Sequence, residues 1–247
     1  MSAAEPKLEP LHHFQVVNYL ELELFGVDLS ISNSVVWMWV SAIAVFVLFR
    51  LALRSPAIIP GRMQMLAEAA YLFIRHMVDE NIRGDGRRYL PLIFALFYFV
   101  LFCNLLGLIP GAFTPTSQLV VTATLAIGVF GYSVALRVVR QGFGFFRAFA
   151  PSGLPPLLLP LMIPIEVLSF MARPVSLAVR LFANMTAGHT VLGVLAFFGL
   201  ALPWFATWLP LGFSIVLNGA EIFIGFIQAY IFTVLTCVYI DDALNAH

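Results

Sequence analysis

The sequence predicts an all-α integral membrane protein with five transmembrane helices and one interfacial amphipathic helix. The last two spans are expected to form a long, steeply tilted antiparallel hairpin. Two observations lead to this fold class. The 247 residues are 61% apolar and only 11% charged, whereas a soluble domain has roughly 45–50% apolar and about 25% charged residues. The apolar residues also gather in runs of the roughly 20 residues that a membrane-spanning helix needs. A soluble globular protein and a disordered chain are both excluded.

The first half of the chain is divided by its charged residues into three spans and one amphipathic segment. Residues 1–34 are acidic and contain no apolar core, so we expect an N-terminal segment outside the membrane. Apolar runs predict membrane-spanning helices at residues 35–54, 89–109 and 119–140. Residues 60–83 mix apolar and charged positions at helical spacing, which is typical of a helix that lies on the membrane surface.

The rest of the chain holds two apolar runs that are too long for upright spans. They cover residues 157–202 and 205–240, and the strong helix breaker between them is Pro203. A helix over residues 164–200 alone would run roughly 55 Å, against about 30 Å of hydrocarbon. We therefore expect two steeply tilted helices joined at Pro203, followed by a cytoplasmic tail at residues 241–247.

The distribution of arginine predicts how the chain crosses the membrane. The connections at residues 50–88 and 137–147 are rich in arginine, whereas the turns around residues 111–115 and Pro203 contain none. Arginine-rich connections of membrane proteins lie in the cytoplasm. We therefore expect the N-terminus outside the cell membrane and the C-terminus in the cytoplasm.

Charged and amide side chains within the last two spans are the candidate functional residues. A charged side chain at membrane depth is costly and commonly marks an ion pathway or a proton relay. The first three spans are almost free of such residues. Those of the last two are Glu166, Arg173, Arg180, Asn184, His189, Asn218, Glu221 and Gln228.

Folding the two long helices back at Pro203 places these residues in three layers. Residues of an antiparallel hairpin that lie at one depth have numbers with a constant sum. A histidine level with a carboxylate suits a proton relay. The expected layers are an outer one of His189 and Glu221, a middle one of Arg180, Asn184 and Gln228, and an inner one of Glu166, Asp241 and Asp242.

Arg180 has no partner of its own in this arrangement. Its guanidinium stays protonated at any relevant pH, and no acid of the two helices lies in its layer. An unpaired buried charge is strongly destabilising. Either water reaches Arg180, or another chain supplies a carboxylate.

Structural alternatives stay open for the other candidates. Arg173 lies nearer the end of its span, where the side chain can reach the membrane interface. Glu166 and Glu221 can be neutral carboxyl groups held by a neighbouring helix. Asn184 and Gln228 can serve only to hydrogen-bond two helices together.

Four motifs resemble subunit a of the proton-translocating F-type ATP synthase. Residues 174–189, PVSLAVRLFANMTAGH, closely resemble the signature of that family. Residues 104–110, NLLGLIP, resemble an earlier motif, and residues 227–239, IQAYIFTVLTCVY, resemble a C-terminal one. The start, PLHHF at residues 10–14, is similar to bacterial members, of the alphaproteobacterial kind. Asn104, in the second motif, is expected to join helices by a hydrogen bond.

The resemblance implies a non-catalytic stator subunit that offers two proton half-channels to a rotating ring of small c subunits. Each ring subunit brings a carboxylate, and the subunit couples proton translocation to ATP synthesis. In many bacterial members the histidine and glutamate of the outer pair stand in exchanged positions. The residues of the family's proton path correspond here to Arg180, which faces the ring carboxylate, and to Glu166, Asn184, His189, Glu221 and Gln228.

The resemblance also implies partners and a location. The partners are the c-ring, b-type subunits of the peripheral stalk, the whole ATP synthase and membrane lipid, and the location is the bacterial inner membrane. Net charge is zero, so we expect no nucleic acid as a partner. No phosphate-binding glycine loop is present. We also expect no cofactor and no metal ion. Cys103 and Cys237 lie in apolar runs and are expected to be core residues.

Two other classes of protein are alternatives to this family. An ion channel or secondary transporter acting as a single chain is the alternative, and internal repeats would support it. A membrane electron carrier would need paired histidine ligands, and only His189 lies within a span. The sequence leaves open the ring size, the coupling ion, and which of His189 and Glu221 carries the proton.

Overall fold

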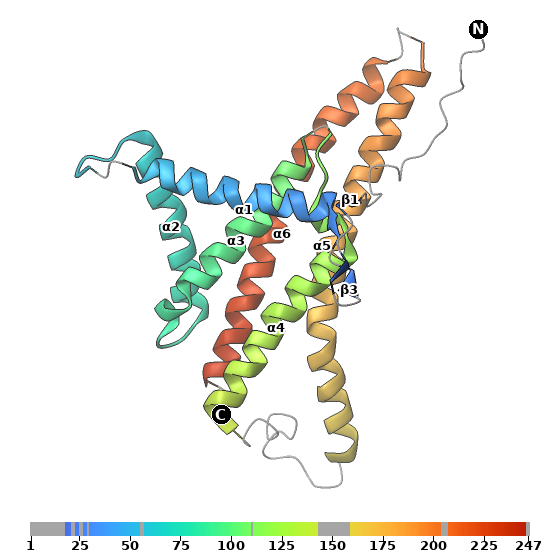
Figure 1. The fold of residues 1–247 in the computed structure, drawn as a ribbon. Coiled ribbons are helices and arrows are strands. Elements are labelled where there is room, and N and C mark those ends of the chain that lie inside the picture. The colour runs from blue at the N-terminus through green and yellow to red at the C-terminus, as the bar shows by residue number, and fades with distance from the viewer. Residues whose placement is uncertain are drawn as a thin grey trace.

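Long apolar helices account for most of the structure (Figure 1). The computed structural model describes residues 18–20, 23–24, 27–28, 30–54, 57–109, 111–142, 159–203 and 207–245. The α-helices in these residues are α1 (Asn33–Ala52), α2 (Arg62–Asn81), α3 (Leu90–Gly107), α4 (Leu119–Gln141), α5 (Leu159–Ala201) and α6 (Trp208–Asn245). All except α2 are long and apolar enough to cross a membrane. The predicted fold class, an all-α membrane protein with five spans, is confirmed.

Short segments of other structure lie before and between the helices. Strand β1 (Asn18–Leu20) pairs antiparallel with β4 (Ile31–Ser32), and β2 (Glu23–Leu24) pairs with β3 (Val27–Asp28). Two single turns of 3-10 helix, η2 (Gly86–Arg88) and η3 (Pro115–Ser117), precede α3 and α4. These strands are not among the elements predicted from the sequence. Residues 1–17, with the motif PLHHF, lie outside the described residues, as do the first two residues of the predicted segment 157–202.

Helices α5 and α6 form the expected long hairpin, and they run side by side in opposite directions (Figure 1). They contain 43 and 38 residues, which is about 65 and 57 Å of helix. Helix α5 passes through Pro164 and Pro174 without ending, as membrane helices can when neighbouring groups replace the lost backbone hydrogen bonds. Helix α4 packs against both members of the hairpin.

Helices α1, α2 and α3 form a second group that meets the hairpin through α6. Helix α2 is amphipathic, as predicted, and one face is buried while charged residues lie among its exposed positions. Phe73 of this helix packs its ring against Phe97 of α3 and Phe226 of α6. The apolar face of α2 therefore contacts other helices of this chain. Part of it also lies exposed on the surface of the molecule.

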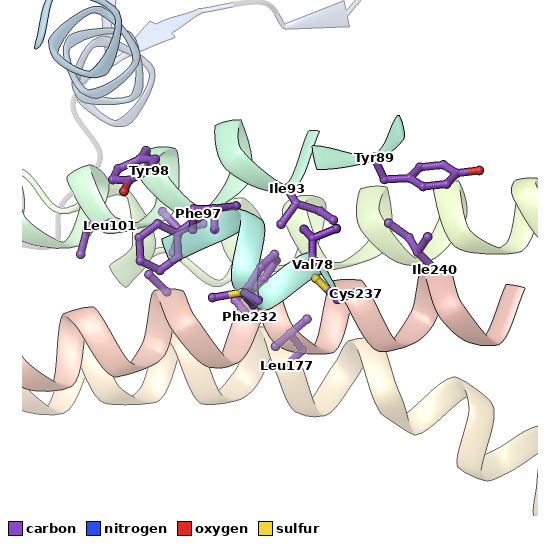
Figure 2. Packing of buried hydrophobic residues seen from close by; sticks show 14 of the residues in the cluster. Val78, Tyr89, Ile93, Phe97, Tyr98, Leu101, Leu177, Phe232, Cys237 and Ile240 are labelled. Atoms are coloured by element: carbon purple, nitrogen blue, oxygen red, sulfur yellow. The ribbon is translucent and has the colours of Figure 1, made fainter. Parts of the chain in front are cut away.

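A buried apolar cluster joins the two groups of helices (Figure 2). Phe97 of α3 is 1% exposed, and Phe232 and Cys237 of α6 are fully buried. Leu177 brings α5 into the same cluster. Because lipid is as apolar as these side chains, close packing rather than the hydrophobic effect holds such helices together. Cys103 is also buried, as expected for both cysteines.

The C-terminal end of α6 extends into the predicted tail at residues 241–247. Residues 241–245 continue the helix, while 246 and 247 lie outside the described residues. The Asp241 carboxylate accepts hydrogen bonds from the backbone N–H and the guanidinium of Arg83, at 2.9 Å and 3.0 Å, and from Asn245 at 2.7 Å. Arg83, in the loop after α2, thus gives Asp241 a partner where the helix continues.

Candidate functional site

Arg180 lies on an outward face of α5. Its side chain is exposed, and the described residues give it no hydrogen bond and no ion pair. The spacing of Ser176, Ala183 and Ala187 puts these small, exposed residues on the same face. Small residues let a neighbouring membrane helix approach closely. This face can therefore receive a helix of another chain, with a permanent cation at its centre.

Asn184 and Gln228 join the two long helices one turn from Arg180. The Asn184 side-chain amide donates to Oε1 of Gln228 at 3.0 Å. Gln228 is 1% exposed, and its own amide nitrogen is buried without a hydrogen-bond partner among the described residues. Two of the three residues predicted for the middle layer, Asn184 and Gln228, are thus in contact. The amide pair stands between the exposed cation and the polar residues nearer the Pro203 turn.

Glu221 occupies a space that α5 leaves open at Gly188. A Cβ atom at position 188 would lie 2.9 Å from Cδ of Glu221 and closer still to its carboxylate oxygen. Glu221 is 8% exposed, and both its oxygens are buried without a hydrogen-bond partner among the described residues. A carboxylate in this situation can accept a proton from a neighbouring donor, since a buried charge without hydrogen bonds is costly.

His189 is held by a residue that the sequence analysis did not single out. Its Nε2 atom lies 2.7 Å from Oγ1 of Thr114, which precedes η3. Thr114 reaches this position because Gly107 of α3 has no side chain: a Cβ there would meet the threonine hydroxyl and lie 2.7 Å from its Cβ. His189 and Glu221 line one cavity, but they share no hydrogen bond, because neither Glu221 oxygen has a partner in the described chain.

The turn that carries Thr114 is itself fixed by buried polar contacts. Thr116 is fully buried and donates to Oδ1 of Asn104 at 2.8 Å, while the Asn104 amide donates to the Gly225 carbonyl at 3.0 Å. Ser117 returns a hydrogen bond to the Thr114 carbonyl at 2.7 Å. These bonds tie η3 to α3 and α6. The expected interhelical role of Asn104 is confirmed.

Two cavities share His189 in their linings. One, of about 340 Å³, is lined by Thr114, Ser117, Ser214 and Asn218, with residues of the loop after α3 and apolar residues of α5. The other, of about 230 Å³, is lined by Glu221 and Asn184 together with mostly apolar residues of both long helices. His189 is the one residue that lines both. Polar side chains therefore lie at intervals from the loop after α3, past His189 and Glu221, to the amide pair of Asn184 and Gln228.

The other end of the hairpin differs from the predicted inner layer. Asp242 pairs with Arg173, whose Nη1 lies 3.3 Å from its carboxylate oxygen, and Asp241 pairs with Arg83. Glu166 is half-buried and has neither a hydrogen bond nor an ion pair among the described residues. The layer of Glu166 with both aspartates was therefore wrong, because the register of the hairpin sets Asp242 beside Arg173, about 10 Å along α5 from Glu166.

The polar residues of the site resemble a path for protons more than a site for metal or substrate. Among the described residues, no group of three His, Cys, Asp or Glu side chains lies close enough to hold a metal ion. Carboxylate, imidazole, hydroxyl and amide groups follow one another along the hairpin instead. Such groups can pass a proton in short steps.

Comparisons with known proteins agree on one family. The family described as ATP synthase A chain matches residues 35–241. The protein named ATP synthase subunit a of Magnetococcus marinus is 56% identical over an alignment of 250 residues, which covers 100% of this chain and 96% of that protein. The protein of the same name from Pelagibacter ubique is 42% identical over 239 residues, covering 96% of this chain and 98% of that protein.

Proposed function

The chain belongs to the ATP synthase A chain family, and we infer from this that it is the proton-translocating stator subunit of the membrane sector. In this role it makes no ATP itself, and catalysis takes place in another part of the enzyme. The alternative of a channel or transporter acting as a single chain is not favoured, because both relatives are named as a subunit of a larger enzyme.

The observation that carries this function is the exposed, unpaired cation on α5. A guanidinium at mid-span is costly without a carboxylate, and the described part of this chain supplies none. The small residues around Arg180 leave room for a helix that brings one. The partner is a ring of c subunits whose carboxylates pass Arg180 one after another.

Two half-channels then reach the ring from opposite sides of the membrane. The outer one runs through the two cavities that meet at His189 and continues past Glu221 to Asn184 and Gln228. The inner one includes Glu166, which has no partner in the described chain and is left available for proton exchange. Arg180 lies between them, so a proton crosses only by riding on a ring carboxylate.

The same proposal includes the orientation of the chain, its membrane and its further partners. The arginine-rich connection around α2 faces the cytoplasm, the N-terminus is periplasmic, the C-terminus is cytoplasmic, and the membrane is the bacterial inner membrane. Besides the c-ring, the partners are b-type subunits of the peripheral stalk and membrane lipid.

Disulfide cross-linking in the assembled enzyme tests the docking face. A cysteine at Ala183 or Ala187 should cross-link to a cysteine beside the ring carboxylate, because both positions lie on the exposed face around Arg180. The matched control is Val139→Cys on α4, which is 83% exposed but lies on another helix. The native cysteines are buried and do not compete. Cross-linking at 139 that equals cross-linking at 183 would contradict the proposed ring contact.

A further inference from the structure

Thr114 makes the hydrogen bond that fixes the histidine of the outer route. The side chain is 5% exposed, and its hydroxyl oxygen lies 2.7 Å from Nε2 of His189. A hydroxyl can donate to a bare ring nitrogen or accept from a protonated one. The contact is therefore available to either form of the ring.

The surroundings of Thr114 hold this hydroxyl in one place. Gly107 leaves the room that the threonine side chain fills. The next residues are clamped by the bond of Thr116 to Asn104 and by the bond of Ser117 to the Thr114 carbonyl. The hydroxyl thus reaches α5 from a segment that is fixed to α3 and α6, not from a loose loop.

His189 is the place where a fixed orientation has a consequence. His189 is the only described residue common to the linings of the two cavities, with Thr114 and Asn218 lining one and Glu221 lining the other. The titratable groups that line these two cavities are His189 and Glu221. A ring turned away from this position could no longer pass a proton from the side of Thr114 to the carboxylate.

We propose that Thr114 is a positioning residue for proton transfer: its hydroxyl holds the His189 ring in the wall between the two cavities, where the ring can pass a proton to Glu221. In this step a protonated imidazole gives one proton to the Glu221 carboxylate, and the neutral ring is protonated again by a hydronium ion that enters the cavity lined by Thr114. This inference rests on the proposed function, since it assigns a role within the outer half-channel.

Two substitutions that act in different ways test the role. Thr114→Val keeps the shape of the side chain and removes the hydroxyl, whereas Gly107→Ala keeps the hydroxyl and pushes it off the ring. Both should lower ATP-driven proton pumping of the assembled enzyme by about 10- to 100-fold, the loss typical of misplacing a reacting group by 1 Å. Thr114→Ser keeps the hydroxyl and should restore most of the rate.

Matched controls lie on α4. Thr124 is exposed and bonds only to the Val120 carbonyl of its own helix at 2.7 Å, so Thr124→Val should pump normally. Gly128 has no atom within 4 Å of an added Cβ, so Gly128→Ala should do the same. Nitrogen-15 NMR of the histidine rings supplies a second readout: the His189 signals, identified by their absence in His189→Leu, should shift in Thr114→Val and Gly107→Ala and stay in Thr114→Ser.

The outcomes separate this inference from the function on which it rests. If Thr114→Val pumps at the normal rate while His189→Leu is impaired, Thr114 is not a positioning residue and the outer route stands. If His189→Leu also pumps normally, the route through His189 fails as well. If Thr114→Val does not assemble, the other two variants decide. An equal loss of pumping in Thr114→Ser, together with an unchanged His189 signal in Gly107→Ala, would show that Thr114 only fills space, and would overturn the proposal.

Discussion

Gly188→Ala should damage the proton path without removing any group from it. The added Cβ would lie 2.9 Å from Cδ and 3.2 Å from Cγ of Glu221. Ordinary contacts between carbon atoms are about 3.5–4.0 Å, so the carboxyl group has to move by roughly 1 Å. A misplacement of this size costs about 100-fold in well-positioned reactions. We expect ATP-driven proton pumping to fall by about 10- to 100-fold.

The assay for Gly188→Ala is proton pumping by inverted membrane vesicles, normalised to the amount of assembled enzyme. Overpacking of this kind costs about 1–3 kcal/mol, so the subunit should still assemble. Gly199→Ala on the same helix is the control, because no atom lies within 4 Å of its added Cβ. In a Glu221→Gln background, Gly188→Ala should cause little further loss. Normal pumping by assembled Gly188→Ala would refute the role given to the position of Glu221.

Two further predictions concern the remaining polar contacts of the hairpin. Asn184→Leu removes the group that donates a hydrogen bond to Oε1 of the buried Gln228 side chain. This loss should lower the stability of the complex by about 1–3 kcal/mol. Adding Gln228→Leu should restore the thermal stability of the complex but not its pumping. Asp241→Asn weakens the pairing of α6 with Arg83; because Arg83 is exposed, the loss should be only about 1 kcal/mol. The midpoint of thermal unfolding of the purified Asp241→Asn complex should fall by about 2–4 °C. Its proton pumping at low temperature should be unchanged. Normal stability in Asn184→Leu, or lost pumping in Asp241→Asn, would contradict these assignments.

The spans and the hairpin could be predicted because membrane insertion leaves a strong signal in the sequence. Apolar runs and the single breaker at Pro203 determine where helices begin and end. The charges within the last two spans mark the candidate site for the same reason, since such residues are rare in lipid. Arg180 and Glu221 could be identified in this way before any contact was known.

The contacts made by neutral polar residues could not be predicted in the same way. Thr114 and Thr116 lie in a turn, where hydroxyl residues are common and carry no signal of depth or partner. Their bonds to His189 and Asn104 depend on how three helices pack, and also on the space left at Gly107. A glycine near the polar turn, Gly107, was the only sign in the sequence that the side chain of Thr114 could pack there.

The prediction for the inner end of the hairpin was wrong for a related reason. The expected layer assumed a constant sum of residue numbers across the hairpin, which set Glu166 level with Asp242. The structure instead pairs Asp242 with Arg173 and lets α6 continue to Asn245. Paired charges do not end a helix as isolated ones would, and the partner Arg83 lies 158 residues away in the sequence.

Arg180 is proposed to separate two half-channels, and removal of its charge is the sharpest test of this role. The measurement compares Arg180→Ala with Arg140→Ala, an exposed arginine at the end of α4. Passive proton conductance is recorded in vesicles stripped of the catalytic part, and ATP synthesis in intact enzyme. Because moving one charge across 100 mV is worth about 2.3 kcal/mol, an open route would dissipate the driving force. We expect Arg180→Ala to lose ATP synthesis and to leak protons, with Arg140→Ala normal in both. Normal ATP synthesis by assembled Arg180→Ala would contradict the account.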